Sequence, residues 1–267
     1  MPEPSSRSPI LELRGVSKRF GAVQALSNVN FEAYPGEVVG LVGDNGAGKS
    51  TLIKCVAGIH PIDEGEIWFE GRRVHIQNPR DAADLGIQTV YQDLALCDNL
   101  DVVGNLYLGR EQTTGLPLDE VSMEKRSIGV LHDLSVSIPS VRTIIASLSG
   151  GQRQSVAISR AVMWNSKLVI LDEPTAALGV LQSHQVLQLI KNLRQQGLAV
   201  VVISHNLADI FEVVDRISIL YLGRNNGVFN VHGTSQEQIV AAITGAEFGN
   251  SNQEKIQGQS RKGGSSK

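Results

Sequence analysis

Short apolar runs alternate with stretches of helical periodicity along most of the chain. The runs at 37–42, 87–91, 168–172 and 199–203 have the length and composition of buried strands. Helical spacing of apolar residues follows each of them, as at 52–59 and 186–193. This alternation predicts an α/β fold with a largely parallel sheet and helices on both faces. In such sheets ligands bind at the carboxyl ends of the strands.

Other segments depart from the parallel pattern. Residues 10–13 and 29–34 alternate apolar and polar positions as half-buried strands do, and a turn is predicted between them at 18–21. Residues 65–76 indicate a hairpin, so we expect an antiparallel β subdomain beside the main sheet. A helix through 85 should be capped near Asn78, with Pro79 at its first position. Towards the carboxyl end we expect helices at 206–214 and 235–244 and strands at 216–222 and 228–231.

The segment 93–164 has a different character from the rest of the chain. Helical periods at 102–108 and 123–134 are separated by a turn-rich stretch at 113–117. We therefore predict a mostly helical subdomain inserted into the sheet domain. Residues 1–9 lack the apolar core of a signal peptide and are expected to be flexible. Residues 248–267 are rich in Gly, Ser, Gln and Lys, and we expect them to be disordered.

Composition narrows the possible partners. The 24 basic and 27 acidic residues give a net charge of −3, and aromatic residues make up 4% of the chain, so neither feature favours nucleic acid. The two cysteines are too few for a disulfide framework, and Cys55 lies at a predicted core position. The longest apolar run, at 198–203, is far shorter than the ~18 residues of a membrane-spanning helix. Any work at a membrane would therefore be done from its side.

A glycine-rich loop joins the first buried strand to a helix. Its residues are Gly43, Asp44, Asn45, Gly46, Ala47, Gly48, Lys49, Ser50 and Thr51. Backbone N–H groups of such a loop and the helix N-terminus attract phosphate. Lys49 can reach the outer phosphates, and the Ser50 hydroxyl can bind magnesium. The alternative is a plain glycine-rich turn, but the order of strand, loop and helix favours a nucleoside triphosphate site.

A pair of carboxylates closes the third buried strand. Asp172 can hold magnesium opposite Ser50, and Glu173 can polarise a water molecule for attack on a phosphate. The alternative is that both residues cap the next helix. His205, which follows the last buried strand, is either a functional residue or a satisfied core histidine. Phe20 alone is more often a core residue than a ligand contact.

A second helix start has the composition of an anion site. Leu148 is followed by Ser149, Gly150, Gly151 and Gln152 at the head of a helix that runs to about Met163. A serine–glycine helix cap is the alternative, and it does not explain the position of this stretch shortly before the strand that ends at Asp172.

Together these motifs resemble the ATP-binding subunits of ABC transporters, and the resemblance covers residues 10 to about 247. It implies a Walker A loop at 43–51, a signature motif at 148–152 and a Walker B strand at 168–173. It further implies that Glu173 is the catalytic glutamate, that His205 is the switch histidine and that Lys49 takes part in catalysis. Phe20 would stack on adenine, while Gln92 would touch magnesium and sense a transmembrane partner.

The same resemblance implies an assembly. Two cassettes pair head to tail with ATP and Mg²⁺ between the Walker A loop of one and the signature motif of the other. Stretches at 90–100, 173–180 and 234–238 are similar to ribose-, xylose- and fructose-type uptake ATPases. These imply a homodimer at the cytoplasmic face of the membrane, bound to permease subunits and indirectly served by an extracytoplasmic sugar-binding protein. Gly179 departs from the Asp that many ABC proteins have after Walker B, which affects the expected communication between sites.

Two other functions are compatible with the cassette motifs. An exporter subunit would share all of them, and the uptake-type stretch at 93–100 argues against it by resemblance. A soluble ABC ATPase acting on DNA or the ribosome usually has a coiled-coil insertion, zinc cysteines or a second cassette. The chain has none of these features, and its net charge is slightly acidic.

Overall fold

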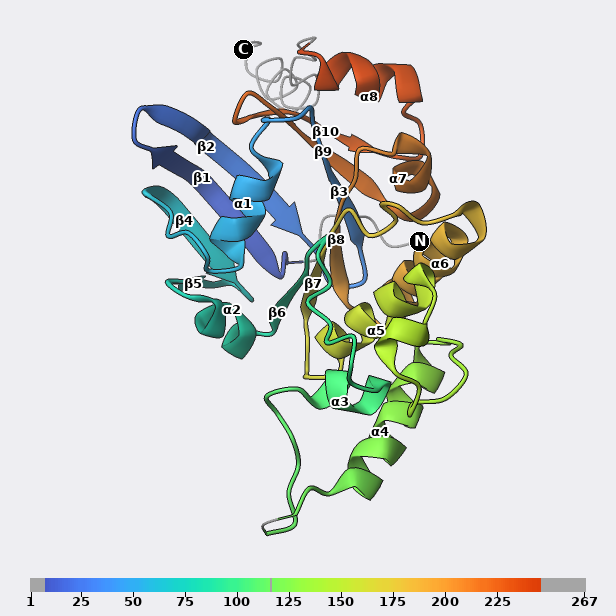
Figure 1. The fold of residues 1–267 in the computed structure, drawn as a ribbon. Helices are drawn as coiled ribbons and strands as arrows, with labels where there is room; N and C mark the ends of the chain where they lie inside the picture. The colour runs from blue at the N-terminus through green and yellow to red at the C-terminus, as the bar shows by residue number, and fades with distance from the viewer. Residues whose placement is uncertain (1–7, 116, 246–267) are drawn as a thin grey trace, which may run out of the picture.

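The main layer of the molecule is a six-stranded sheet (Figure 1). The computed structural model describes residues 8–115 and 117–245. The strands of this sheet are β3 (Val38–Val42), β6 (Ile87–Val90), β7 (Leu168–Asp172), β8 (Ala199–Ile203), β9 (Arg216–Tyr221) and β10 (Arg224–Asn230). They lie in the order β10-β9-β3-β8-β7-β6, and every neighbouring pair except the antiparallel β10–β9 pair is parallel. The predicted α/β fold with a largely parallel sheet is confirmed.

A second, antiparallel sheet packs against the first. Its strands are β1 (Leu11–Phe20), β2 (Val23–Ala33), β4 (Glu64–Phe69) and β5 (Arg72–Val74), in the order β2-β1-β4-β5. The predicted turn at 18–21 is wrong for its first three residues, because β1 continues to Phe20, which pairs with Val23. Shifts of register between Leu13 and Arg19 interrupt the side-chain alternation, so the pattern did not indicate the full length of either strand.

Helices cover both faces of the six-stranded sheet. They are α1 (Lys49–Val56), α2 (Pro79–Leu85), α3 (Val102–Tyr107), α4 (Glu120–Asp133), α5 (Gly150–Val162), α6 (Val180–Gln195), α7 (Leu207–Val213) and α8 (Gln236–Ile243). Successive side chains of β3 point to opposite faces of the sheet. Leu41 is buried in the core with α1, and Val42 is buried in the core with α5 to α8. Figure 1 shows α1 and α5 on opposite sides of the central strands.

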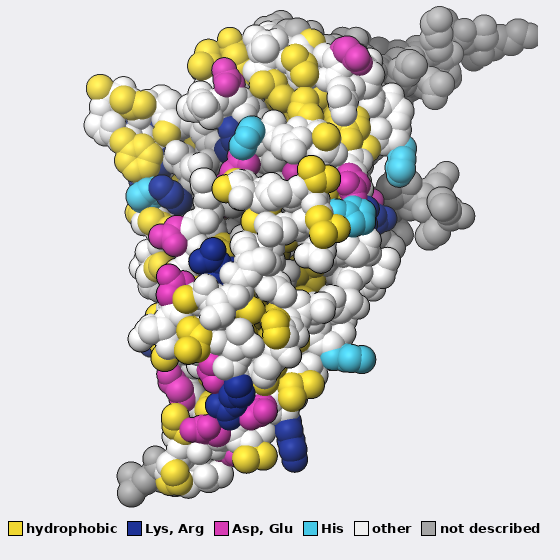
Figure 2. All heavy atoms as spheres, turned by 45° about the vertical axis from the view of Figure 1, so that its right-hand side comes forward, with side chains coloured by type: hydrophobic (Ala, Val, Ile, Leu, Met, Phe, Trp, Pro, Cys, Tyr) yellow, Lys and Arg dark blue, Asp and Glu magenta, His cyan; other side chains and the backbone are white. Residues whose placement is uncertain are grey.

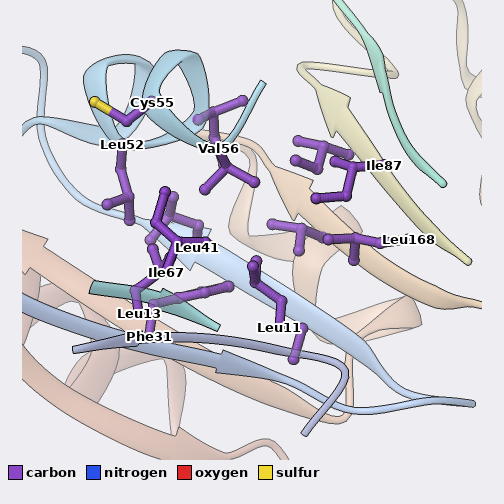
Figure 3. Packing of buried hydrophobic residues seen from close by; sticks show 14 of the residues in the cluster. Leu11, Leu13, Phe31, Leu41, Leu52, Cys55, Val56, Ile67, Ile87 and Leu168 are labelled. Carbon is purple, nitrogen blue, oxygen red and sulfur yellow. The ribbon is translucent and has the colours of Figure 1, made fainter. Parts of the chain in front are cut away.

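The first core lies between α1 and the two sheets (Figure 3). Leu52 and Val56 of α1 meet Leu41 of β3 and Leu13 of β1 in one buried cluster. Cys55 is buried there as predicted, and burial raises the pKa of its thiol to about 11. Ile59, predicted on the same helical face, is 42% exposed because α1 ends at Val56.

The helices of the 93–164 segment have a core of their own. Val102, Leu106, Met123 and Leu131 form a buried cluster with Val156 of α5, at the lower end of the view in Figure 1. On the face seen in Figure 2, acidic and basic side chains are interspersed at this end. We propose that residues 93–164 form a helical subdomain inserted into the sheet domain.

The outermost parts of the chain lie beyond the described residues. The predicted flexible amino end, apart from residues 8 and 9, and the predicted disordered tail at 248–267 both lie there. Within the residues that the structure describes, no helix is long and apolar enough to cross a membrane.

Candidate nucleotide-binding site

Four neighbouring parallel strands bring the predicted residues to one edge of the sheet. The strands β3, β8, β7 and β6 are adjacent in that order, and they run in the same direction. Gly43 follows β3, His205 follows β8, Glu173 follows β7 and Gln92 follows β6. Gln92 is exposed and follows β6, and the strands β7 and β8 lie between β6 and β3.

The glycine loop passes close over its neighbours. A Cβ on Gly43 would lie 2.3 Å from the Leu220 carbonyl oxygen, and one on Gly48 would lie 2.8 Å from the Ala25 carbonyl oxygen. Both glycines are therefore required by close packing as well as by their positive φ angles. Asp44, Asn45, Gly46 and Ser50 are exposed, Gly43, Gly48, Lys49 and Thr51 are half-buried, and Ala47 is buried. The loop is thus open to a ligand on one side and packed on the other.

Lys49 closes the loop on itself. Its Nζ donates to the Gly43 carbonyl oxygen at 2.7 Å and to the Asp44 carbonyl oxygen at 3.0 Å. Burial lowers the pKa of Lys49, while the negative charges of Glu173, Asp44 and Asp172 oppose that shift. The ammonium group therefore lies within the field of the carboxylates at the end of β7. Its carbonyl contacts are ones that phosphate oxygens could replace.

Asp172 and Glu173 form an acidic pair at the end of β7. Burial raises the pKa of Asp172, and the neighbouring Glu173 raises it further against the influence of Lys54 and Lys49. Glu173 has a left-handed backbone with φ of 51°, and its N–H donates to the Ile203 carbonyl oxygen at 2.9 Å. A non-glycine residue in this conformation indicates a local constraint of the kind found at functional sites. Neither carboxylate caps the next helix, because α6 begins at Val180 with Gly179 as its N-cap.

His205 reaches Glu173 from the neighbouring strand. Its Nδ1 lies 2.9 Å from Glu173 Oε2, and its side chain is 76% exposed while that of Glu173 is 17% exposed. His205 is therefore not a satisfied core histidine. The pair places an imidazole at the solvent side of a mostly buried carboxylate.

The donor set near the loop suits magnesium. The Ser50 hydroxyl and the Asp172 carboxylate are oxygen ligands, which Mg²⁺ prefers. Burial and the charge of Glu173 raise the pKa of Asp172, and a bound cation would favour its charged form. In residues 8–115 and 117–245 no group of three or more His, Cys, Asp or Glu side chains could hold a metal ion alone. Phosphate oxygens of a nucleotide and water would have to complete the coordination.

Ser149 caps α5 and forms a capping box with Gln152. The Ser149 Oγ accepts from the Gln152 N–H at 3.3 Å, and Gln152 Oε1 accepts from the Ser149 N–H at 3.0 Å. Gly150 and Gly151 lie against the start of α6, where a Cβ on Gly151 would be 2.9 Å from Gln182 Cβ. The helix-cap interpretation therefore describes the local role of Ser149. Because α5 and α1 pack on opposite faces of the sheet, the structure does not bring this motif to the glycine loop.

Phe20 is a surface residue with an aromatic neighbour. Its ring is 43% exposed and packs edge-on against His60, with the ring centroids 5.1 Å apart. Lys18 Nζ lies 5.6 Å from the Phe20 ring and 2.7 Å from Asp63 Oδ1. His60 and Asp63 could not be predicted as neighbours of Phe20, because no motif or spacing links the loop after α1 to the end of β1.

A strand, a glycine-rich loop and a helix, with a carboxylate at the end of a neighbouring parallel strand, define a P-loop nucleotide-binding protein. The family model described as "ABC transporter" matches residues 26–176. The chain belongs to the ABC transporter family, which confirms the resemblance found in its motifs. It is accordingly an ATP-binding ATPase, as the sequence predicted.

Curated relatives align over nearly the whole chain. The xylose/arabinose import ATP-binding protein of Sulfolobus acidocaldarius is 45% identical, over 92% of this chain and 98% of that protein. The fructose import ATP-binding protein of Rhizobium meliloti is 46% identical, over 91% of this chain and 96% of that protein. A ribose import ATP-binding protein of Burkholderia cenocepacia is 39% identical over 93% of this chain, which spans only 49% of that protein.

Solved structures agree with the fold. A nucleotide-free ATP-binding cassette from an ABC transporter has a TM-score of 0.76 and 26% identity, covering 89% of this chain and 96% of that one. A dimeric cassette in a post-hydrolysis state, bound to ADP and Pi, has a TM-score of 0.70 and 27% identity, covering 84% and 100%. The cassette fold predicted from the motifs is thereby confirmed.

Proposed function

We propose that this chain is the ATP-hydrolysing subunit of an ABC importer for a monosaccharide. The observation that carries the proposal is end-to-end similarity to single-cassette proteins named for xylose/arabinose and fructose import. The alternatives of an exporter subunit and of a soluble ABC ATPase have no comparable support among these relatives. The proposal places the chain at the cytoplasmic face of a membrane, bound to permease subunits that an extracytoplasmic sugar-binding protein serves.

ATP would bind across the glycine loop, with Phe20 against adenine and Lys49 on the outer phosphates. Lys49 would exchange its contacts with Gly43 and Asp44 for phosphate oxygens. The Ser50 hydroxyl, Asp172 and Gln92 would hold Mg²⁺, directly or through water, and the ion would neutralise charge on the phosphates.

Hydrolysis needs a water molecule placed in line with the terminal phosphate. Glu173 is the group we assign to orienting and polarising that water. His205, held against Glu173 at 2.9 Å, would fix the carboxylate and contact the terminal phosphate from the next strand. Because the contact joins the ends of β7 and β8, it would hold both side chains in place for the reaction.

The working site would be shared by two copies of the chain. The Ser149 helix end and the glycine loop are both built to bind anions, yet their helices lie on opposite faces of one sheet. A head-to-tail dimer would bring each loop to the partner's Ser149, Gly150, Gly151 and Gln152. A monomer should then hydrolyse ATP poorly, so specific activity should fall as the protein is diluted.

Mixing two defective variants tests the shared site. Lys49→Ala removes the phosphate-binding cation, and Ser149→Glu places a negative charge where the partner's ATP would lie. The second change also suits a helix N-terminus, so α5 should stay folded. Each variant alone should be inactive, and the mixture should regain part of the activity, because a mixed dimer contains one intact site. A mixture as inactive as its components would contradict the shared site.

A groove beside the stretch after Gln92 is the surface we assign to the permease. It has a volume of about 330 Å³ and is lined by Tyr91, Leu94, Arg110, Arg160 and Trp164, among others. Arg160 donates to the carbonyl oxygens of Ala95 and Leu94 at 2.8 and 2.9 Å, and burial lowers its pKa. A half-buried guanidinium bound to carbonyls favours a partner segment that brings a carboxylate and apolar side chains.

Transport itself is tested in cells that lack the gene. Labelled pentoses and fructose are tested one by one, and uptake of one of these sugars should be lower than in cells that have the gene. The wild-type chain should restore that uptake, and Glu173→Gln should not. Loss of efflux in place of uptake would support the exporter alternative. Unchanged transport of every sugar, with ATPase activity intact, would favour a non-transport ATPase.

A further inference from the structure

The turn between β9 and β10 holds the closed side of the glycine loop. The N–H of Gly223 donates to the Ala47 carbonyl oxygen at 3.0 Å, and the Gly223 carbonyl oxygen accepts from the Ser27 N–H at 2.8 Å. One residue thus bonds to the loop on one side and to β2 on the other. Gly223 is 176 positions after Ala47 in the chain, so no motif of the loop includes it.

The bond to Ala47 fixes the direction of one peptide group. In a trans peptide the C=O and the following N–H point in opposite directions. Because the Ala47 carbonyl points to the turn, the N–H of Gly48 points away from it, to the open side of the loop. That N–H is one of the backbone donors that a phosphate would meet there.

The contact leaves no room for a side chain at Gly223. Its φ is +75°, and an added Cβ would lie 2.6 Å from the Ala25 carbonyl oxygen and 3.1 Å from the Ala25 carbonyl carbon. The Cβ position on Gly48 is itself 3.5 Å from Gly223 Cα. A larger residue at 223 must therefore move the turn, β2 or the glycine loop.

We infer that Gly223 is a positioning residue for the phosphate-binding loop. By orienting the Ala47–Gly48 peptide from behind, it presents the Gly48 N–H to the nucleotide without touching the nucleotide itself. The inference rests on the proposed ATP site at 43–51. It adds the β9–β10 turn, which belongs to none of the cassette motifs, to the elements on which ATP affinity depends.

Gly223→Ala is the test, and Gly71→Ala is its matched control. Gly71 lies in the β4–β5 turn with a φ of +73°, and a Cβ there would meet no atom within 4 Å. Both substitutions introduce the same backbone strain, but only the first disturbs the loop. We expect Gly223→Ala to weaken ATP binding about tenfold or more, the loss of one oriented donor to a charged ligand. Gly71→Ala should bind ATP as the wild type does, with a smaller loss of thermal stability because its Cβ meets no atom within 4 Å.

Hydrogen exchange on the unmodified chain gives a second measurement if Gly223→Ala does not fold. Binding of a non-hydrolysable ATP analogue should slow exchange of the peptide segment that contains Gly223 and leave the Gly71 turn unchanged. Equal ATP affinity of the two variants, or unchanged exchange at Gly223 on binding, would overturn the inference. A wild-type chain that binds no ATP would instead overturn the proposed site.

Discussion

The Nδ1 of His205 lies 2.9 Å from the Oε2 of Glu173, and this contact joins the ends of two neighbouring strands. The backbone supports the same junction, since the Glu173 N–H donates to the carbonyl oxygen of Ile203, two residues before His205. The main chain of Glu173 and its side chain are therefore both held by the end of β8. Movement of that strand end would therefore change the orientation of the Glu173 carboxylate.

Glu173→Gln should retain ATP binding and lose turnover. The amide keeps the size of the side chain but cannot act as a base, so we expect hydrolysis to slow by at least ~10²-fold. ATP should then hold the dimer closed, which size-exclusion chromatography with ATP and with ADP would detect. Near-normal turnover in this variant would contradict the role of Glu173.

His205→Ala should lower the rate of hydrolysis more than it changes ATP affinity, because the imidazole lies against the Glu173 carboxylate, while Lys49 and the loop backbone would still hold the phosphates. His184→Ala is the control. His184 also lies near a glutamate, with its Nδ1 3.7 Å from Glu212 Oε1, and is 65% exposed, but it belongs to α6. Steady-state kinetics should show a lower kcat with a similar KM for the first variant only. Equal effects of both changes would remove His205 from the proposed mechanism.

Much of the sheet domain could be predicted from the sequence, because its strands are short, apolar and separated by strong signals. Asn78 caps α2 together with Asp81, as predicted. Ser149 caps α5, as the alternative interpretation of that stretch had it, and Ser235 caps α8 at the start of the predicted helix 235–244. The end of β1 could not be predicted, because irregular pairing with β2 breaks the alternation there. Such pairing depends on tertiary packing rather than on local sequence.

The candidate site could likewise be predicted only in part from the sequence. The residues in motifs could be named because a loop between a strand and a helix restricts what its residues do. His60 beside Phe20 and Gly223 behind Ala47 could not be named, because each contact joins segments that are distant in the chain. Contacts of this kind depend on how the two sheets pack and leave no periodic signal in the sequence.

Asp172→Asn should stabilise the nucleotide-free protein at neutral pH. The pKa of Asp172 is raised above its ordinary 3.8 by burial and by Glu173. The folded state therefore binds this proton more tightly than the unfolded state does. The contribution of Asp172 to stability falls as pH rises from 3.8 through the raised pKa of the folded state. Asparagine removes this cost, so Tm should rise at pH 7, and the gain should shrink towards pH 4.

The matched control for that change is Asp84→Asn, an exposed position in α2. Thermal unfolding of both variants between pH 4 and pH 8, without nucleotide, measures the effect. Hydrolysis should be lost in Asp172→Asn in spite of the higher Tm, because the variant lacks the proposed metal ligand. A Tm at pH 7 no higher than that of the wild type would show that the buried charge of Asp172 does not destabilise the folded protein.

Phe20→Ala should weaken ATP binding with little loss of stability, because the ring is 43% exposed. Stacking of a base on an aromatic side chain contributes about 1–3 kcal/mol, so we expect affinity to fall by about tenfold. Phe20→Tyr should bind as the wild type does, and the loss in Phe20→Ala should be smaller for free triphosphate than for ATP. An equal loss for both ligands would place Phe20 away from adenine.

Gly179→Asp should stabilise α6 and report on communication between the two sites. Gly179 is the N-cap of this helix, with extended backbone angles and without a side-chain cap, and an added Cβ would meet no atom within 4 Å. An Asp there can accept from the first free N–H groups of α6, which should add a few tenths of a kcal/mol. Gly179→Ala lacks the acceptor and should lower Tm.

The same substitution tests communication between the two ATP sites. If the carboxylate that many ABC proteins have at this position couples the two sites, Gly179→Asp should also raise the Hill coefficient for ATP. A higher Tm with an unchanged Hill coefficient would show that the side chain at 179 only caps the helix.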